Sequence, residues 1–526
     1  MMKKEKFLQL LKVCTFFFVT CYLSCTSERE TAFTRMQAHF SEDTLHHAIA
    51  TYYQAYARYH HGVQRTLVDS LGQPATITYE GFPSDTAFLY HLRLNSYKYV
   101  EGPSLPDEKA MTDAALERRI NVMAEVRELP WCRDIAWDDF CQYVLPYRNG
   151  DEELNDWYLS FREKYLHTIP DSVADTSSIR EVTYYLIRCL QRDIKYGTQL
   201  GRFYQCKFLT PEEIERMHTV ECKALAHYGT LALRSCGIPC TMLETFWRFT
   251  EVVHSSILIP QVKGNEHAFR LSIYDEPQDM GLPKDSMASW RTWSYEFTPN
   301  PDLMELADDP DVPQSFSLPV NRHDRTAIFS TTHEFVRPVP DSLSMRRHLF
   351  LCRFHNWRWY PIREGRVKDG AVHFKDATIR QWYRLGYMEA DTVKTFGETF
   401  TLLGDGRIQP YDSKGDTVMY KLVYNCQPEE NKEQRQVTSY YWSWSSTPDH
   451  REWTPVTGRA TLWGLNEKTG EYRIFHESMR KDFKPVFHLL EVHLPQWTVF
   501  TDDSMPRPLG YIVTDSISNE GYFMQF

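Results

Sequence analysis

The sequence predicts a multidomain α+β protein with a helical N-terminal layer, an α+β core and C-terminal β-sandwich-like domains. Three observations support this prediction. Apolar residues recur at helical spacing through most of residues 31–169. A helix and three strands are then expected between residues 222 and 275. Beyond residue 331 the pattern changes to short alternating strands separated by turns. At 526 residues the chain is too long for one hydrophobic core.

Two amphipathic segments predict helices in the N-terminal part. Asp43 opens a run in which Ile49 and Tyr52 fall at helical spacing, and residues 110–129 form a second segment of this kind. Residues 72–83 are expected to form a loop or a small hairpin. We expect this helical region to pack on the core and to shape its cleft.

A helix is predicted to begin at Cys222. Leu225 and Leu231 recur among alanines, Gly237 supplies a C-terminal stop, and a strand over residues 240–246 should follow. The first turn of a helix favours a thiolate, because its unpaired N–H groups and the positive end of its dipole lie there. Such a position can lower the pKa of a cysteine from about 8.5 to between roughly 3.5 and 7.5. The alternative is a buried structural cysteine.

Two strands downstream carry the other candidate catalytic residues. One begins at His254, and the next, residues 268–274, ends at Asp275. A cysteine at a helix start, followed by a histidine and an aspartate on successive strands, is an arrangement suited to nucleophilic catalysis. His267 is a rival to His254. It lies eight residues from Asp275 along one strand, too far for contact, so His254 is favoured.

These residues resemble the transglutaminase-like superfamily, particularly large lipoproteins of that kind from Bacteroides-type bacteria. The matching pattern is Cys222, Arg234 twelve residues on, Gly-Ile-Pro at 237–239, then Trp247 and His254. The resemblance implies a papain-like α+β core.

The resemblance extends upstream, where residues 140–148, Glu152, Glu153 and Trp157 are similar to a helical signature of the same lipoproteins. Two positions depart from the family pattern. Glu221 stands where a small residue or Asp is usual, and Ser256 where Trp is usual.

The resemblance implies acyl transfer or hydrolysis at an amide bond, as in a cysteine protease or amidase. Cys222 would attack a carboxamide or peptide carbonyl, and His254 would hold the ion pair and protonate the leaving amine. Asp275 would orient the imidazole. The Cys222 backbone N–H is one expected oxyanion donor, and Gln205 is a guess for the second. The expected substrate is a protein, peptide or glycopeptide, and no metal or organic cofactor is implied.

A non-catalytic surface lipoprotein is the alternative, with its papain-like core kept as a scaffold. The aromatic C-terminal domains would then bind glycan or peptide. Glu221 favours this alternative, because a carboxylate beside a thiol raises the pKa of that thiol. A zinc site built from His218, Cys222, Cys236 and Cys240 is disfavoured, because the spacing matches none of the strong zinc patterns.

The first residues predict export and lipid anchoring. Three lysines precede an apolar run over residues 7–23, which is too short and too interrupted for a convincing membrane span. The run ends close to Cys25 in a sequence that resembles a relaxed bacterial lipobox, so Cys25 is the expected lipidation site. Cys21 is a weaker alternative site, and plain secretion is the alternative to anchoring. The expected location is the cell envelope, at the outer membrane or cell surface, with membrane contact through the lipid only.

Charge excludes one further class of function. The net charge of −11 argues against a nucleic-acid binder, which needs a basic face. The predicted organisation, in chain order, is a lipoprotein signal peptide (1–25), a helical N-terminal region (26–175), a transglutaminase-like core (176–300), a Pro-rich linker (301–330), a β-sandwich domain (331–428) and a second β-rich domain (429–526).

Overall fold

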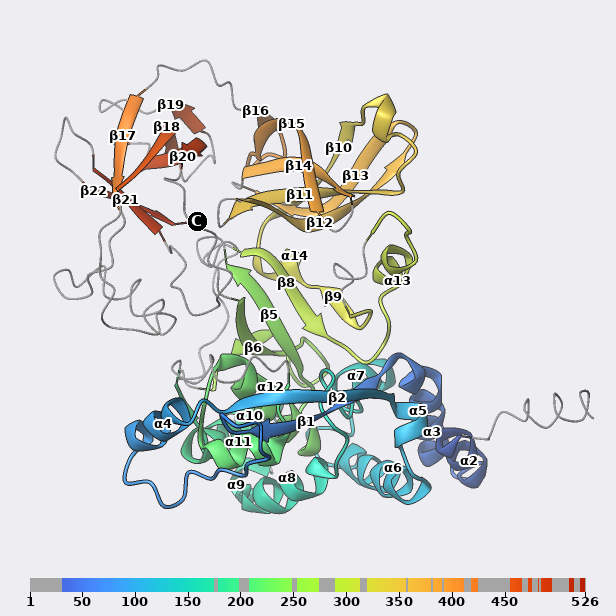
Figure 1. The fold of residues 1–526 in the computed structure, drawn as a ribbon. Coiled ribbons are helices and arrows are strands. Elements are labelled where there is room, and N and C mark those ends of the chain that lie inside the picture. The colour runs from blue at the N-terminus through green and yellow to red at the C-terminus, as the bar shows by residue number, and fades with distance from the viewer. Residues whose placement is uncertain are drawn as a thin grey trace, which may run out of the picture.

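The computed structural model describes residues 31–410 with short gaps, together with strand segments further on. The gaps are 175–177, 198–207, 248–252, 274–288, 313–318, 356–357, 380–381 and 390–391. Beyond residue 410 the described residues are 418–423, 455–465, 472–474, 481, 484–493, 510–514 and 521–525. The mixed α+β class predicted from the sequence is confirmed (Figure 1). Among the described residues, no helix is both long and apolar enough to cross a bilayer.

Helices dominate the first half of the described chain, as the sequence predicts. Asp43 is the N-cap of one of them, and its side chain accepts hydrogen bonds from the N–H groups of Leu45 and His46. Thr210 and Glu213 form a capping box at the start of another. The helices are α2 (Ala32–His39), α3 (Thr44–Tyr56), α4 (Asp85–Leu94), α5 (Asp107–Ala110), α6 (Asp113–Arg127), α7 (Trp137–Tyr143), α8 (Trp157–Tyr165), α9 (Asp171–Ala174), α10 (Ile179–Asp193), α11 (Pro211–Met217) and α12 (Cys222–Ser235).

A five-stranded antiparallel sheet follows α12 in the chain, in the order β7-β6-β5-β8-β9. Its strands are β5 (Thr241–Trp247), β6 (Val253–Ile259), β7 (Phe269–Leu271), β8 (Ser289–Tyr295) and β9 (Arg322–Asp324). The strands predicted near residues 240–246 and 254–260 are thus confirmed. Gly237, with φ of 78°, makes the turn between α12 and β5. Two short two-stranded sheets accompany this one: β1 (His61–Val68) with β2 (Lys98–Pro106), and β3 (Lys195–Tyr196) with β4 (Thr219–Val220).

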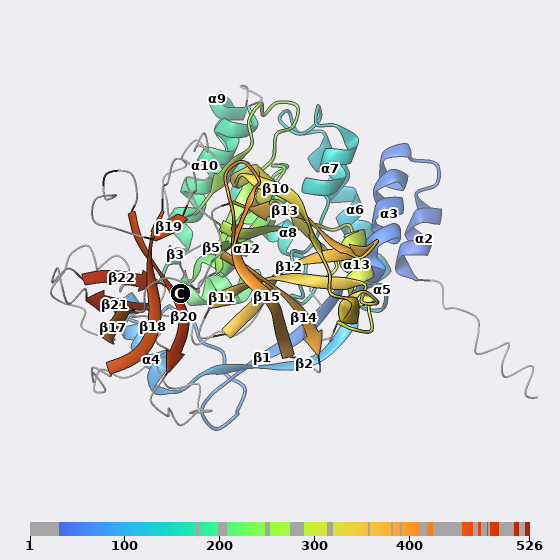
Figure 2. The ribbon, with the colours of Figure 1, turned by 90° about the horizontal axis from the view of Figure 1, so that it is seen from above.

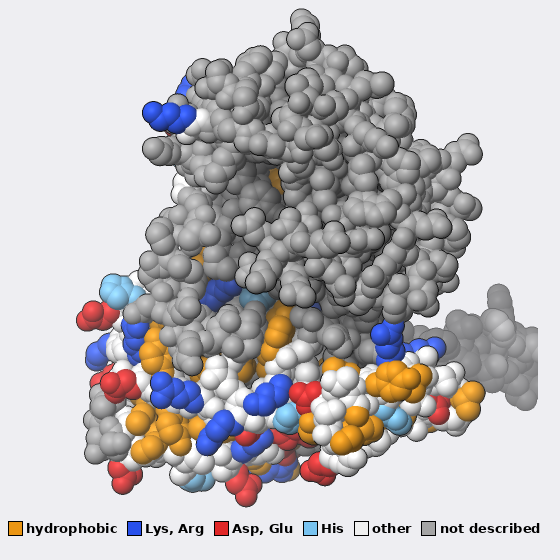
Figure 3. Space-filling model, turned by 90° about the vertical axis from the view of Figure 1, so that its left-hand side faces the viewer, with side chains coloured by type: hydrophobic (Ala, Val, Ile, Leu, Met, Phe, Trp, Pro, Cys, Tyr) orange, Lys and Arg blue, Asp and Glu red, His pale blue; other side chains and the backbone are white. Residues whose placement is uncertain are grey.

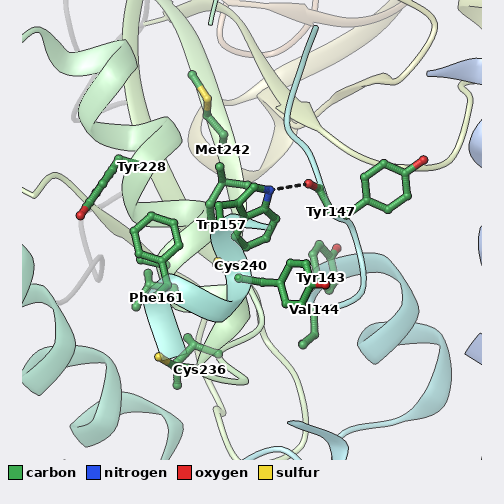
Figure 4. Packing of buried hydrophobic residues seen from close by; sticks show 14 of the residues in the cluster. Tyr143, Val144, Tyr147, Trp157, Phe161, Tyr228, Cys236, Cys240 and Met242 are labelled. Carbon is green, nitrogen blue, oxygen red and sulfur yellow. Dashed lines mark hydrogen bonds between the residues drawn. The ribbon is translucent and has the colours of Figure 1, made fainter. Parts of the chain in front are cut away.

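One hydrophobic core joins the N-terminal helices to this sheet. It contains Phe33 of α2, Ile120 of α6, Leu231 of α12 and Ile257 of β6, all almost fully buried. Figure 4 shows the packing around Trp157, whose indole N–H donates to the Tyr147 carbonyl oxygen at 3.1 Å. The predicted boundary near residue 175 therefore falls inside a continuous core, because α12 and β6 bury apolar residues against these helices.

A seven-stranded antiparallel sheet forms the next part of the chain, in the order β10-β13-β12-β11-β14-β15-β16. It is curled, and the His333 Nε2 atom lies 3.1 Å from the Gly404 carbonyl oxygen, which brings β10 close to the β15–β16 turn. Figures 1 and 2 together show this sheet above the core, in front of α12 and β5 when seen from above. Its strands are β10 (Thr332–Pro338), β11 (His348–His355), β12 (Arg358–Lys368), β13 (Ala371–Thr378), β14 (Trp382–Glu389), β15 (Thr392–Leu402) and β16 (Ile408–Pro410).

A six-stranded sheet contains the described residues beyond 410, where β-structure is also predicted. The strand order is β19-β18-β17-β21-β22, and β20 also pairs with β18. The strands are β17 (Val418–Val423), β18 (Pro455–Leu465), β19 (Tyr472–Ile474), β20 (Lys484–His493), β21 (Gly510–Thr514) and β22 (Gly521–Gln525).

The segment predicted as a Pro-rich linker is instead built into the fold. It contains α13 (Pro301–Ala307), strand β9 and α14 (Thr326–Phe329). Leu303 and Leu306 of α13 are buried against Trp293 of β8 and Phe350 of β11. Apolar residues of α13 pack on both neighbouring sheets and so make the described residues of this segment part of the fold despite the prolines.

Buried ion pairs join the five-stranded and the seven-stranded sheets. The Arg291 guanidinium contacts the Asp324 carboxylate at 2.8 Å and both carboxylate oxygens of Glu364, at 2.6 and 2.8 Å. Arg363 Nη1 contacts the same Asp324 oxygen at 2.6 Å. Burial alone would raise the pKa of Asp324, but Arg363 and Arg291 hold it well below its usual value. The carboxylate therefore stays ionised between two arginines from different sheets.

Candidate active site

Cys222 is the first residue of α12, where the sequence predicts it. The N-cap of this helix is Glu221, whose carboxylate accepts from the N–H groups of Lys223 at 2.8 Å and of Ala224 at 3.2 Å. Two of the N–H groups expected to support a thiolate are therefore already bound to a carboxylate.

The predicted low pKa of the Cys222 thiol is wrong in direction. Burial and the neighbouring Glu221 carboxylate raise its pKa to about 12, although hydrogen bonds from the backbone of Ser255 and Lys223 oppose this. The thiol donates to Glu221 Oε2, with the sulfur 3.6 Å from that oxygen. The sequence already indicates that Glu221 would raise this pKa, but the burial that contributes most to the rise could be seen only in the packed structure.

The start of β6 meets the start of α12. The Ser255 backbone lowers the pKa of the Cys222 thiol, so the peptide bond that follows His254 lies in the neighbourhood of the sulfur. The structure thus places the backbone of His254 next to the Cys222 sulfur, although the two residues are 32 positions apart in the sequence.

The pairing of β5 with β6 fixes which way each side chain points. Ser255 lies opposite Glu244, whose Oε1 atom is 3.0 Å from the Lys223 Nζ atom on α12. Directly opposite residues share a face, so Ser255 faces α12 and His254 points to the other face. A contact between the imidazole and the thiol must therefore form around the edge of β6.

His254 is buried, 4% exposed, and is neutral at ordinary pH. Burial, together with the positive charge of Arg270 on β7, lowers its pKa to about 3. With the thiol pKa near 12 and the imidazole pKa near 3, the resting pair is a neutral thiol and a neutral imidazole. The ion pair that the resemblance implies is not the resting state, because both groups are desolvated.

The remaining predicted residues lie elsewhere. His267 is exposed, in the turn between β6 and β7, at the end of β6 away from Ser255. Ile259, at that end, is four positions along the strand from Ser255, a distance of roughly 13 Å. Asp275, Gln205 and Cys25 lie outside the described residues.

Charged groups beside Cys222 compensate one another. Glu244 contacts Lys223 Nζ and Arg322 Nη2, each at 3.0 Å, and Arg322 donates to the Tyr295 hydroxyl at 2.5 Å. Burial would raise the pKa of Glu244, but Arg322 and Lys223 hold it at about 2. This cluster attaches the start of α12 to the centre of the sheet.

The upstream signature forms a buried polar network behind α12. Arg234 Nη1 donates to Asn149 Oδ1 at 2.8 Å, and Asn149 Nδ2 lies 3.1 Å from His227 Nδ1. The Glu152 carboxylate accepts from the backbone N–H groups of Asn149 and Gly150, both at 2.8 Å. These residues hold α12 in place, so their pattern is a signal of structure rather than of catalysis.

The other members of the considered zinc set are dispersed. The His218 ring stacks on Tyr79, and Cys236 and Cys240 are fully buried, with burial raising the pKa of each thiol to about 12. Within the described part of the chain, no group of three or more His, Cys, Asp or Glu residues could hold a metal ion. The seven cysteines that the structure describes are all free thiols.

Comparison with known proteins adds no assignment. No family model matches the chain, and no curated protein matches it.

Proposed function

We propose that this chain is an exported, lipid-anchored protein with a transglutaminase-like core that performs cysteine-dependent acyl transfer or hydrolysis at amide bonds. The observation that carries the proposal is the meeting of two segments. The helix α12, which begins at Cys222, packs against β6, the strand that carries His254, and the Ser255 backbone lowers the pKa of the Cys222 thiol. The proposed substrate is a protein, peptide or glycopeptide.

Because both groups are neutral at rest, the proposed mechanism is general-base activation of a neutral thiol rather than attack by a preformed thiolate, and it requires the imidazole to reach the sulfur around the edge of β6. His254 would take the proton as Cys222 attacks the carbonyl carbon, and would return it to the leaving amine. The S–H bond breaks as the S–C bond forms, and water or an amine then releases the acyl group from the thioester. Asp275 remains the proposed orienting residue for the imidazole.

A second function has its own support. The Glu221 carboxylate beside a thiol of raised pKa favours a non-catalytic scaffold, because a nucleophilic cysteine needs access to its thiolate. In that case the core would only position the C-terminal β units, which would bind glycan or peptide.

Replacing Cys222 with alanine is expected to abolish amide cleavage or acyl transfer while leaving the fold intact, because it removes the nucleophile and one sulfur atom of packing. His254→Ala should cost nearly as much, and His267→Ala little. Turnover of casein-derived peptides and incorporation of a fluorescent amine into protein substrates, measured with the full chain, would check this.

Cys236→Ala is the matched control. Cys236 is buried and is the C-cap residue of α12, at the opposite end of the helix from Cys222. This substitution should lower stability only. Full activity of the Cys222→Ala variant would exclude the cysteine mechanism. A wild type that cleaves no amide, yet binds peptide or glycan as well as Cys222→Ala does, would establish the scaffold.

Replacing Cys25 with alanine is expected to release the protein from membranes, because a lipid-modified cysteine is the only proposed anchor. Fractionation of the exporting cell, with immunodetection of soluble and membrane pools, measures this. Cys21→Ala is the control and should leave the protein in the membrane pool. Recovery of Cys25→Ala in membranes would place the anchor elsewhere.

A further inference from the structure

We infer that Glu221 restrains Cys222: its carboxylate holds the thiol protonated and occupies the helix N–H groups that would otherwise stabilise a thiolate. The inference rests on the proposed function and concerns the regulation of the same site.

Three contacts carry it. Glu221 Oε2 accepts from the Cys222 thiol at 3.6 Å and from the Lys223 N–H at 2.8 Å, while Oε1 accepts from the Ala224 N–H at 3.2 Å. One carboxylate therefore bonds to the sulfur and to two N–H groups at the same helix end. Burial raises the pKa of Glu221, while these N–H groups and the Lys223 ammonium oppose that rise. A thiolate would have to compete with the carboxylate for those donors.

The surrounding charges do not relieve this competition. On α12, the Lys223 ammonium lies near the site but pairs with Glu244 of β5, which also binds Arg322 of β9. On the other face of β6, His254 lies in the field of Arg270 from β7, which opposes its protonation. Within the described residues, Glu221 is the ionisable group that hydrogen-bonds to the sulfur.

A substitution at position 221 can lift this restraint without removing the helix cap. A neutral residue at 221 that still caps the helix keeps α12 in place and removes the negative charge from the sulfur. Serine is such a residue, because it is among the preferred N-caps. The thiol proton could then leave to His254 or to water at a lower pH than in the wild type.

The test is the rate at which iodoacetamide alkylates Cys222 in the full chain, followed from pH 6 to pH 10 by peptide mass spectrometry. In the wild type we expect slow alkylation at pH 7 and a rate that still rises at pH 10. In Glu221→Ser and Glu221→Gln the alkylation rate at pH 7 should rise about tenfold or more, and its pH profile should move down by at least about one unit.

Glu213→Gln is the matched control. Glu213 also belongs to an N-terminal cap, on α11, where its carboxylate accepts from the Thr210 N–H at 2.8 Å and has no hydrogen bond to a cysteine among the described residues. It should lower stability without changing Cys222 alkylation. Circular dichroism shows whether each variant folds, and Glu221→Gln, closest in shape to the native residue, serves if Glu221→Ser does not.

The outcomes separate this inference from the proposed function. Folded variants at position 221 that react as slowly as the wild type would overturn the restraint. Faster alkylation without any amide cleavage would support the restraint and count against the enzyme. Rapid alkylation of the wild type at pH 6 would overturn the restraint while leaving cysteine catalysis intact.

Discussion

Replacing Arg148 with methionine is expected to lower the free energy of unfolding by about 3–5 kcal/mol, the usual cost of leaving one member of a buried ion pair alone. Arg148 Nη2 contacts the Asp107 carboxylate at 2.7 Å, and both side chains are about 1% exposed or less. Arg148 Nη1 also donates to the carbonyl oxygens of Glu152 and His61, at 2.7 and 3.0 Å. The variant leaves a buried carboxylate without its counterion and these carbonyls without their donor.

The effect should depend on pH in a defined direction. Burial already raises the pKa of Asp107 above 3.8, and Arg148 opposes that rise, so the variant raises the pKa further. Above 3.8 the ionised carboxylate in the folded state costs stability, and protonation removes this cost as the pH falls. The difference between wild type and variant should therefore be smaller at pH 5 than at pH 8, measured by urea unfolding.

Arg118→Met is the control for the loss of an arginine. Arg118 pairs with Asp156 at 2.7 Å on the surface, where the two side chains are 49% and 38% exposed. Its removal should change the unfolding free energy by no more than about 1 kcal/mol. Equal losses for Arg148→Met and Arg118→Met would show that the buried pair has no special structural role.

A fragment of residues 31–321 is expected to lose cooperative unfolding, whereas a fragment of residues 31–410 keeps it. The shorter fragment lacks the seven-stranded sheet and so exposes Trp290 and Trp293, which are 7% and 2% exposed in the whole structure. It also removes Asp324 and Glu364, leaving Arg291 without these carboxylates.

The size of this effect follows from the area involved. Burial of each large apolar side chain is worth about 1.5–3 kcal/mol. Trp290, Trp293, Leu303 and Leu306 together thus supply several kcal/mol, against a total stability of about 5–15 kcal/mol for a domain. Urea unfolding followed by tryptophan fluorescence, with dye binding as a second probe, compares the two fragments. A 31–321 fragment as stable as 31–410 would mean that the two sheets are independent.

The local elements were predictable from the sequence because their signals are local. Three elements depend only on neighbours within a few positions. They are the helix start after Glu221, the turn at Gly237 with its positive φ, and the strand at residues 254–260. The short strands predicted beyond residue 331, such as β11 and β17, were predictable for the same reason, since alternation has a period of two.

The chain's amino-acid order therefore determined the class of fold, the position of Cys222 at a helix start and the strand that carries His254. The tertiary structure decided the state of the site and the limits of the core. A pKa depends on desolvation and on charges a few ångströms away, so only the packed structure could set the Cys222 thiol near 12 and the His254 imidazole near 3. Likewise, only long-range packing against Trp293 and Phe350 could make a Pro-rich segment part of the interior.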